Sequence, residues 1–316
     1  MPTQSGRRAE PTWLRRVSEI VTMSDRDLFT AGDDGLVPRG DAARQAIDSL
    51  RGYAYQVTAA ALAWLDIDEQ GRLFLEVAED YAVVARNAIE AVQVKDTEAS
   101  GTVTLNTGSV RDAVADFVSL RAINPNADVQ LRYFTTSEIG TERAVDERPG
   151  GMAGLAYWRN AATGADVGPL RSILESDNFS AAVQAFVKDR DDETLRSDLL
   201  RKIQWDCGRP HLAALRKEFE ERLVLVGRDV FRLSAPEATR IADILIYRVL
   251  DRSIAKNAAD RVLTRAALYL AVDDATRIFV PRVAADMMTL ISSGLTASAL
   301  ASPNFDPRLN ASIRRV

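Results

Sequence analysis

Three polar residues of this 316-residue chain, Asp80, Gln93 and Lys95, are spaced so that a β-hairpin would bring their side chains together. The stretch 81–95 is β-prone, with a polar break at 86–87 that we interpret as a tight turn. Such a turn places Asp80 directly opposite Gln93 on the neighbouring strand. Because side chains alternate along a strand, Gln93 and Lys95 point to the face that Asp80 occupies. The sequence thus predicts that a carboxylate, an amide and an ammonium converge.

These three groups have the chemistry of a metal-assisted hydrolytic site. Carboxylate and amide oxygens suit Mg²⁺ or Mn²⁺, ions that keep several waters and share oxygens with a phosphate substrate. A lysine beside such an ion can orient or deprotonate the attacking water and stabilise the charge that develops on the phosphate. The alternative is that Asp80, Gln93 and Lys95 are ordinary solvated residues on an exposed sheet face. The apolar neighbours of Gln93 favour a central strand instead, where a polar pair needs a reason.

The elements that would hold these residues alternate between helix and strand. Apolar residues recur at helical spacing over 41–65 and 109–122, and β-prone runs lie between and after these helices. The expected strands cover residues 73–77, 81–84, 89–95 and 129–136. The resulting order of helix, three strands, helix and strand predicts an α/β core.

A cluster of proline, glycine and charged residues at 147–151 is the best candidate for a domain boundary. We therefore expect two domains, 1–150 and 151–316. Beyond Pro169 the pattern is almost wholly helical, with capping signals such as the one at 234–237. The predicted helices cover residues 170–188, 192–205, 210–225, 236–255, 262–276 and 281–294. The second half is thus expected to be an α-helical scaffold or oligomerisation domain.

Composition excludes several classes of protein. With 47% hydrophobic and 27% charged residues, and with no evident signal peptide or membrane span, the chain is expected to be a globular cytoplasmic protein without membrane contact. One cysteine, Cys207, and one histidine, His211, cannot form an internal disulfide or a Cys/His zinc site. Their spacing of four could suggest a nucleophile and its base, but Pro210 between them favours a helix junction.

The charge is unevenly distributed along the chain. The formal net charge is −5, and residues 1–150 carry 16 Lys and Arg against 24 Asp and Glu. Such an acidic chain is not typical of a constitutive nucleic-acid binder, because phosphate neutralisation supplies most non-specific affinity. A nucleic-acid substrate would therefore require a metal, a local basic patch or oligomerisation, and we expect a homo-oligomer.

Four short motifs resemble the PD-(D/E)XK nuclease superfamily. They are Gly52-x-x-Tyr55-Gln56, Glu79-Asp80, Gln93-Val94-Lys95 and the strand end Tyr133-Phe134-Thr135-Thr136-Ser137. The most similar branch is the double-stranded DNA endonuclease domain of CD-NTase-associated (CBASS) effectors and of related anti-phage STAND ATPases. Further patches at 154–158 and 263–265 extend the resemblance from about residue 40 into the helical half. The resemblance implies an α/β restriction-endonuclease-like core, with a mixed sheet flanked by helices, followed by an α-helical domain.

By position, the resemblance implies that Asp80 and Gln93 bind the metal and that Lys95 is the catalytic lysine. Gln56 would complete or orient the site from the first helix. Gln93 stands where the superfamily's general pattern has Glu or Asp, which removes a negative charge, although the Gln-x-Lys form is usual in this branch. Only one of Glu79 and Asp80 can face Gln93, because neighbouring strand residues point to opposite faces. The hairpin register favours Asp80, with Glu79 as a carboxylate that either supports a metal ligand without binding the metal itself or points outward.

We therefore expect a Mg²⁺- or Mn²⁺-dependent endonuclease, a hydrolase that cleaves phosphodiester bonds of double-stranded DNA as an anti-phage defence effector. Family effectors also carry a sensor, so a sensor domain or partner protein would lie outside this chain. The alternative is a catalytically inactive nuclease-fold protein that acts as a DNA- or partner-binding assembly module. A third hypothesis, a helical interaction module with an incidental α/β cap, fails if the predicted hairpin packs against the helix that carries Gln56.

Overall fold

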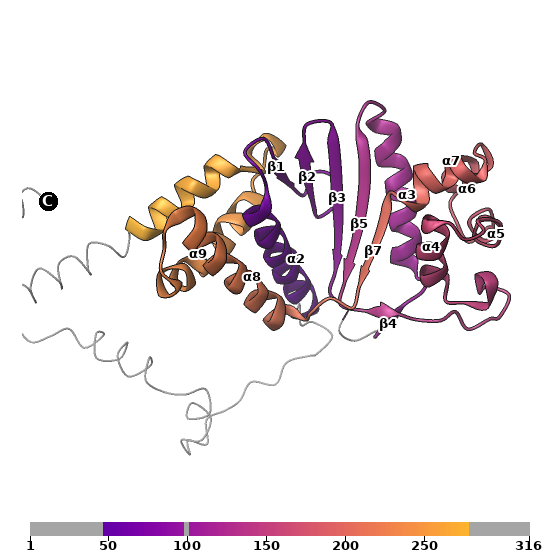
Figure 1. Cartoon of the computed structure of the whole chain (residues 1–316), viewed down its shortest axis with the longest axis horizontal. Helices are drawn as coiled ribbons and strands as arrows, with labels where there is room; N and C mark the ends of the chain where they lie inside the picture. The colour runs from indigo at the N-terminus through magenta and orange to yellow at the C-terminus, as the bar shows by residue number, and fades with distance from the viewer. Residues whose placement is uncertain (1–46, 98–100, 278–316) are drawn as a thin grey trace, which may run out of the picture. The chain divides into compact units, whose positions relative to one another are not determined.

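A six-stranded mixed sheet separates the helices of this protein into two layers (Figure 1). The computed structural model describes residues 47–97 and 101–277. In sheet order the strands are β7 (Ile203–Cys207), β5 (Asp128–Thr135), β3 (Ala88–Lys95), β2 (Tyr81–Ala85), β1 (Arg72–Leu75) and β8 (Val262–Thr264). β3, β5 and β7 run parallel, whereas β2, β1 and β8 are joined by antiparallel pairing. A separate parallel pair joins β4 (Thr102–Val103) to β6 (Glu138–Ile139).

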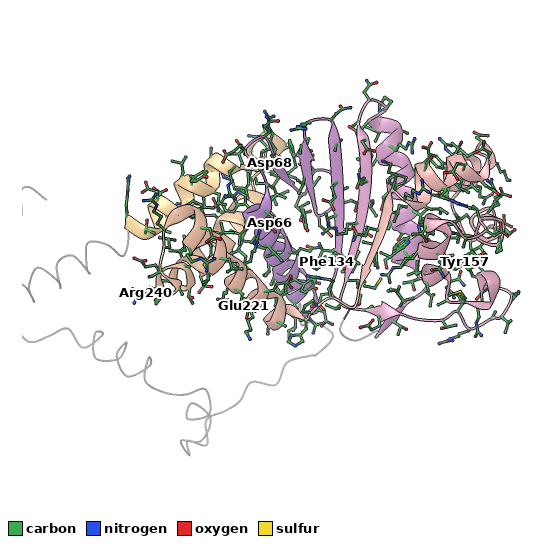
Figure 2. All side chains as sticks on the ribbon, in the orientation of Figure 1. Asp66, Asp68, Phe134, Tyr157, Glu221 and Arg240 are labelled. Carbon is green, nitrogen blue, oxygen red and sulfur yellow. The ribbon has the colours of Figure 1, made fainter. Side chains whose placement is uncertain are left out.

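Helices cover both faces of the sheet, and each layer has its own hydrophobic cluster. The helices are α2 (Ile47–Asp66), α3 (Gly108–Ile123), α4 (Gly154–Thr163), α5 (Gly168–Leu174), α6 (Ala181–Lys188), α7 (Asp192–Leu195), α8 (Leu212–Val226) and α9 (Ala235–Ser253), followed by a helix over residues 265–277. Helices α2, α8 and α9 pack on one face, and α3 to α7 lie on the other side. Phe134 belongs to the first cluster and Tyr157 to the second (Figure 2).

The helix α2 forms because its apolar residues recur along one stripe. Val57, Ala61 and Trp64 are each at most 5% exposed, so this stripe faces the core. Trp64 also donates a hydrogen bond from Nε1 to the carbonyl oxygen of Thr264 at 3.0 Å. This bond connects α2 to the end of β8 and holds the helix against the sheet.

The hairpin of β2 and β3 has the register that the sequence predicts. Tyr81 pairs with Val92 and Ala85 pairs with Ala88, so the turn falls at 86–87 as expected. The first turn residue has a φ of 54°, the left-handed conformation that tight hairpin turns require. The residues just before β2 are thereby brought beside the C-terminal half of β3.

The C-terminal ends of the three parallel strands meet at one edge of the sheet. Lys95, the last residue of β3, pairs with Thr135 of β5, which pairs in turn with Cys207 of β7. β3 is an interior strand between β2 and β5, and its residues 91–94 are buried. In open α/β sheets, sites collect at the carboxyl ends of parallel strands. The predicted polar residues therefore lie where such a fold can form a site.

Two strands come from the part of the chain in which we expected helices. β7 falls at the end of the predicted helix 192–205, and β8 opens the predicted helix 262–276. Both are edge strands, with five and three residues, and so short a run has no clear periodicity. Pairing with β5 and β1 decides their conformation. The prediction that the chain beyond Pro169 is almost wholly helical is wrong at these two places.

Strands from both sides of residue 150 share one sheet, and α8 and α9 pack against α2. By contacts the chain divides into Met1–Ala46 and Ile47–Val316, and every described residue belongs to the second unit. The predicted helix 281–294 and the start of the predicted helix 41–65 lie outside the described residues. Among the helices that the structure describes, none has the length and apolarity needed to cross a membrane.

Candidate functional site

Asp80, the residue just before β2, is held by donors from two different elements. The backbone N–H of Val94 in β3 donates to Oδ2 at 2.5 Å, and Nε2 of Gln56 in α2 donates to Oδ1 at 2.8 Å. Burial raises the pKa of Asp80, and these donors together with the charge of Lys95 oppose that rise. The carboxylate is therefore fixed in position and largely removed from water. The hairpin thus packs against the helix of Gln56, which rules out the hypothesis of a purely helical module with an incidental cap.

The side chain of Gln93 is buried and only partly satisfied. Gln93 is 7% exposed, and its Nε2 donates to Oε2 of Glu79 at 3.2 Å. Its Oε1 is also buried, and no donor among residues 47–97 and 101–277 reaches it. A buried acceptor without a partner costs on the order of 1–3 kcal/mol. A partner for this atom must therefore be a water molecule or a bound ligand.

Glu79 reaches Gln93 because its backbone does not follow the alternation of a strand. Its φ of 66° lies in the left-handed region, which residues with a Cβ rarely adopt. β2 begins only at Tyr81, so the alternation that we assumed from the sequence does not extend to Glu79. Strand alternation therefore does not decide between the two carboxylates: Glu79 bonds the amide of Gln93, which is the supporting position left open for it, and Asp80 bonds the backbone one residue further along β3. Both carboxylates reach the end of β3.

A third carboxylate, Asp116 of α3, lies within electrostatic reach of Glu79. Burial raises the pKa of Glu79 to about 6, and the charges of Asp116 and Asp80 add to this rise. The pKa of Asp116 is itself raised, first by burial and then by Asp112, one turn away on the same helix. Sequence reasoning did not find Asp116. The pair of carboxylates four residues apart was the available signal, but only the packing of α3 brings one of them to Glu79.

Lys95 keeps its ammonium available at the end of β3. The side chain is half-buried and has no hydrogen bond or ion pair within the described part of the chain. Its charge nevertheless lowers the pKa values of Glu79, Asp80 and Asp116. The ammonium therefore lies near all three carboxylates, and its donors are available to a substrate.

The backbone that presents Lys95 is anchored by the next residue. The side chain of Asp96 is 2% exposed and forms an ion pair with Arg51 of α2 at 2.9 Å. Asp96 also accepts a hydrogen bond from Oγ1 of Thr136 at 3.4 Å. Removing one partner of a buried ion pair is strongly destabilising, so this contact fixes the end of β3 against α2.

The oxygen donors around Gln93 fit a hard divalent cation. Asp80, Glu79 and the unpartnered Oε1 of Gln93 offer the carboxylate and amide oxygens that Mg²⁺ and Mn²⁺ prefer. Within residues 47–97 and 101–277, no group of three or more His, Cys, Asp or Glu side chains is arranged to hold a metal. An ion here would therefore depend on the amide oxygen of Gln93 and on water, and Mg²⁺ usually keeps several waters.

Other residues that could have taken part in chemistry or binding have structural roles instead. Cys207 ends β7 and His211 immediately precedes α8, so a junction lies here as expected, but it joins a strand to a helix and not two helices. Burial raises the pKa of the Cys207 thiol to about 11, which disfavours a thiolate nucleophile. Trp158 and Trp205 are buried and pack edge to face with ring centroids 5.3 Å apart, so they belong to the core.

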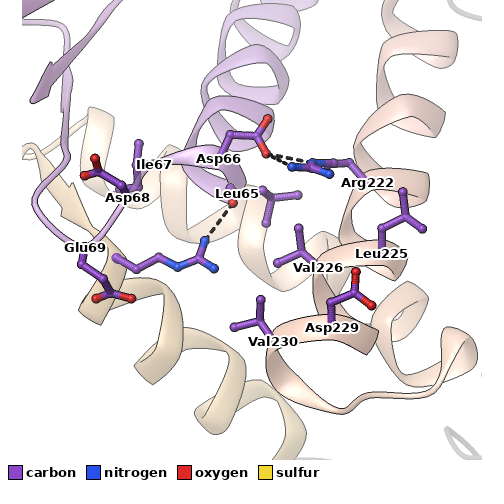
Figure 3. Close-up of a pocket in the computed structure, with 11 residues that line it drawn as sticks. Leu65, Asp66, Ile67, Asp68, Glu69, Arg222, Leu225, Val226, Asp229 and Val230 are labelled. Atoms are coloured by element: carbon purple, nitrogen blue, oxygen red, sulfur yellow. Dashed lines mark hydrogen bonds and ion pairs between the residues drawn. The ribbon is translucent and has the colours of Figure 1, made fainter.

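A cavity of about 390 Å³ lies at the C-terminal end of α2 (Figure 3). Arg222 forms an ion pair with Asp66 at 2.6 Å, and Arg265 donates to the carbonyl oxygen of Leu65 at 2.8 Å. Asp66 is ten residues from Gln56, or about 15 Å along the helix. Because its two arginines already have protein partners, we assign this cavity no part in the site.

No protein-family model and no curated protein matches this chain. Among solved structures, the chain is similar to the Cap4 SAVED/CARF-domain containing receptor of Acinetobacter baumannii bound to the cyclic trinucleotide 2'3'3'-cAAA, with 12% identity and a TM-score of 0.44, over 77% of this chain and 46% of that one. A second structure of this receptor gives the same identity and TM-score, over 76% and 48% of the two chains. The chain thus spans about half the length of the receptor structures that it matches.

Proposed function

We propose that this chain is a Mg²⁺- or Mn²⁺-dependent endonuclease that hydrolyses phosphodiester bonds of double-stranded DNA. The observation that carries the proposal is the buried Oε1 of Gln93, which lacks a partner in the described residues although the Asp80 and Glu79 carboxylates are held at the same strand end. The Asp80 carboxylate and the unsatisfied amide oxygen of Gln93 would supply part of a coordination shell, which water would complete. Lys95, two residues further along β3, adds the charge that phosphoryl chemistry requires.

Each residue has a distinct part in the proposed reaction. Asp80 and Gln93 would hold the ion, and Gln56 keeps the Asp80 carboxylate in position through its hydrogen bond. When bound, the ion would supply Lewis acidity and a water of lowered pKa. Lys95 would donate to a non-bridging phosphate oxygen, or orient the attacking water, and so stabilise the negative charge that develops in the transition state.

The proposed hydrolysis is balanced by one water molecule. The water oxygen forms a bond to phosphorus as the bond from phosphorus to the leaving sugar oxygen breaks. One proton of the water leaves with the solvent or a site base, and the leaving oxygen takes up a proton. No oxidant, reductant or further substrate is required.

The acidic charge of the chain limits which residues could neutralise the phosphates of bound DNA. The net charge of −5 disfavours duplex DNA beyond the metal site, so arginines after residue 150 or a second protomer would neutralise phosphates. The resemblance of the sequence motifs supports a role as an anti-phage effector that works with a sensor outside this chain. These expectations belong to the proposal and are tested by the dependence of cleavage on salt and on protein concentration.

The test is cleavage of supercoiled plasmid DNA by the full chain in Mg²⁺, in Mn²⁺ and in EDTA. Cleavage in both metals and its loss in EDTA are expected. The alternative function, a catalytically inactive nuclease-fold module that binds DNA or a partner, is favoured by the lack of a three-carboxylate metal cluster among the described residues. A folded chain that shifts DNA in a gel but leaves the plasmid intact in either metal would support that alternative.

A further inference from the structure

We propose that Glu79 is a positioning residue of this site, which orients the amide of Gln93 so that its oxygen faces the cation. The inference rests on the proposed metal-dependent function. It also gives Glu79 a second effect, because its carboxylate supplies the negative charge that a glutamine at position 93 does not carry. The sequence left open whether Glu79 supports a metal ligand or points outward.

The hydrogen bond between the two side chains selects one of two amide orientations. Nε2 of Gln93 donates to Oε2 of Glu79 at 3.2 Å. In the opposite orientation the amide oxygen would meet the carboxylate, so two acceptors would face each other with no proton between them. Glu79 therefore keeps Nε2 toward itself, and Oε1 is left buried and unpartnered among the described residues. A cation that binds oxygen ligands would therefore meet an Oε1 that is already oriented.

The loop before β2 is built to place Glu79 in this position. The N–H of Glu76 donates to the carbonyl oxygen of Asp80 at 3.0 Å, which closes the loop over residues 76–80. Both Glu76 and Glu79 have left-handed backbones, with φ of 51° and 66°. Of these two carboxylates, only that of Glu79 bonds Gln93. Glu76 is thus a matched control, since it has the same charge, a similar backbone and a place in the same loop.

The decisive experiment is a titration of the full-length protein with Mn²⁺ by isothermal titration calorimetry, after removal of metals with EDTA. We expect Glu79→Gln to weaken Mn²⁺ binding about 10–100-fold, as is usual when a residue that orients a ligand is replaced. The exchange Glu79→Gln with Gln93→Glu should restore most of the affinity, because an amide then donates to a carboxylate in the reverse sense. Glu76→Gln should bind Mn²⁺ as the wild type does.

Four results would overturn the inference. Wild-type affinity in a folded Glu79→Gln variant would show that Glu79 does not act on the site. A folded double variant that still binds Mn²⁺ weakly would show that the hydrogen bond between residues 79 and 93 does not set the affinity. An equal loss of affinity in Glu76→Gln would show that any negative charge in the loop has the same effect. A wild-type protein that binds no Mn²⁺ would overturn the metal site and this inference together. Binding of Mn²⁺ without plasmid cleavage would contradict the endonuclease activity and leave the role of Glu79 intact.

Discussion

Gln56, in the middle of α2, donates a 2.8 Å hydrogen bond to Asp80, 24 residues further along the chain. This bond connects the helical layer directly to the carboxylate that precedes β2. The other oxygen of Asp80 accepts from the backbone of Val94. The orientation of the carboxylate thus depends on how α2 packs on the sheet, and not on β2 alone.

Replacing Gln56 should therefore affect both the position and the charge of Asp80. We expect Gln56→Ala to lower the free energy of unfolding by about 1 kcal/mol and to raise the pKa of Asp80, because the side-chain donor that stabilises its charged form is lost. Metal-dependent cleavage should fall about 10–100-fold. Thermal unfolding and plasmid cleavage measure the two effects, with the exposed residue Gln130→Ala as the control. Full cleavage by a folded Gln56→Ala variant would contradict the assigned role.

Replacing Asp80 should separate stability from metal binding. Asp80→Asn removes the cost of burying an ionised carboxylate, but it also turns an acceptor toward the donor of Val94 or Gln56 into an amide N–H, so we expect its free energy of unfolding in EDTA to fall about 1–2 kcal/mol below that of the wild type. In Mg²⁺ the wild type should gain stability with ion concentration, whereas the variant should gain none. Differential scanning calorimetry in EDTA and over a Mg²⁺ series measures this. An Asp80→Asn variant with the Mg²⁺-dependent stabilisation of the wild type would place the ion elsewhere.

The pH dependence of stability should report the burial of Glu79. Its folded-state pKa of about 6 lies above the ordinary value of 4.5, so the folded state binds more protons than the unfolded state between these pH values. The associated stability is fully present below pH 4.5 and is lost as pH rises through about 6. Solvent screening of this partly exposed group should limit the loss to about 1 kcal/mol. Urea unfolding in EDTA measures it, and a Glu79→Gln variant with the same slope would assign the effect to another group.

Truncation after residue 150 should prevent folding. Such a fragment lacks β7, β8, α8 and α9, which supply both edges of the sheet and much of the layer on α2. We expect residues 1–150 to show no cooperative unfolding transition by circular dichroism, and the full chain to show one. Cooperative unfolding of the fragment would mean that the first 150 residues form a domain of their own, as the sequence pattern alone suggested.

The hairpin register could be predicted because one turn fixes the pairing of every residue on both strands. The turn at 86–87 and the alternation of the strands were sufficient to place Lys95 at the end of a central strand. Glu79 could not be predicted in the same way. Its left-handed backbone lies outside the strand, and nothing in the local residue types requires it.

The remaining features depend on tertiary contacts that no local pattern reveals. β8 has only three residues and becomes a strand through its pairing with β1. Asp116 approaches Glu79 only because α3 packs beside the parallel strands. The resemblance of the motifs implied only that Gln56 completes or orients the site, and neither it nor the spacing of the two residues indicated the hydrogen bond to Asp80.

The most direct test of the account compares plasmid cleavage by the wild type, Lys95→Ala and Lys202→Ala at saturating Mg²⁺. Lys202 is the matched control, because it pairs with Asp128 at the opposite end of the parallel strands. The account predicts that Lys95→Ala keeps the fold, as measured by circular dichroism, and loses cleavage by a factor on the order of 10² or more. It predicts wild-type cleavage for Lys202→Ala. A folded Lys95→Ala variant that cleaves at the wild-type rate would contradict the central claim that this strand end is a nuclease site.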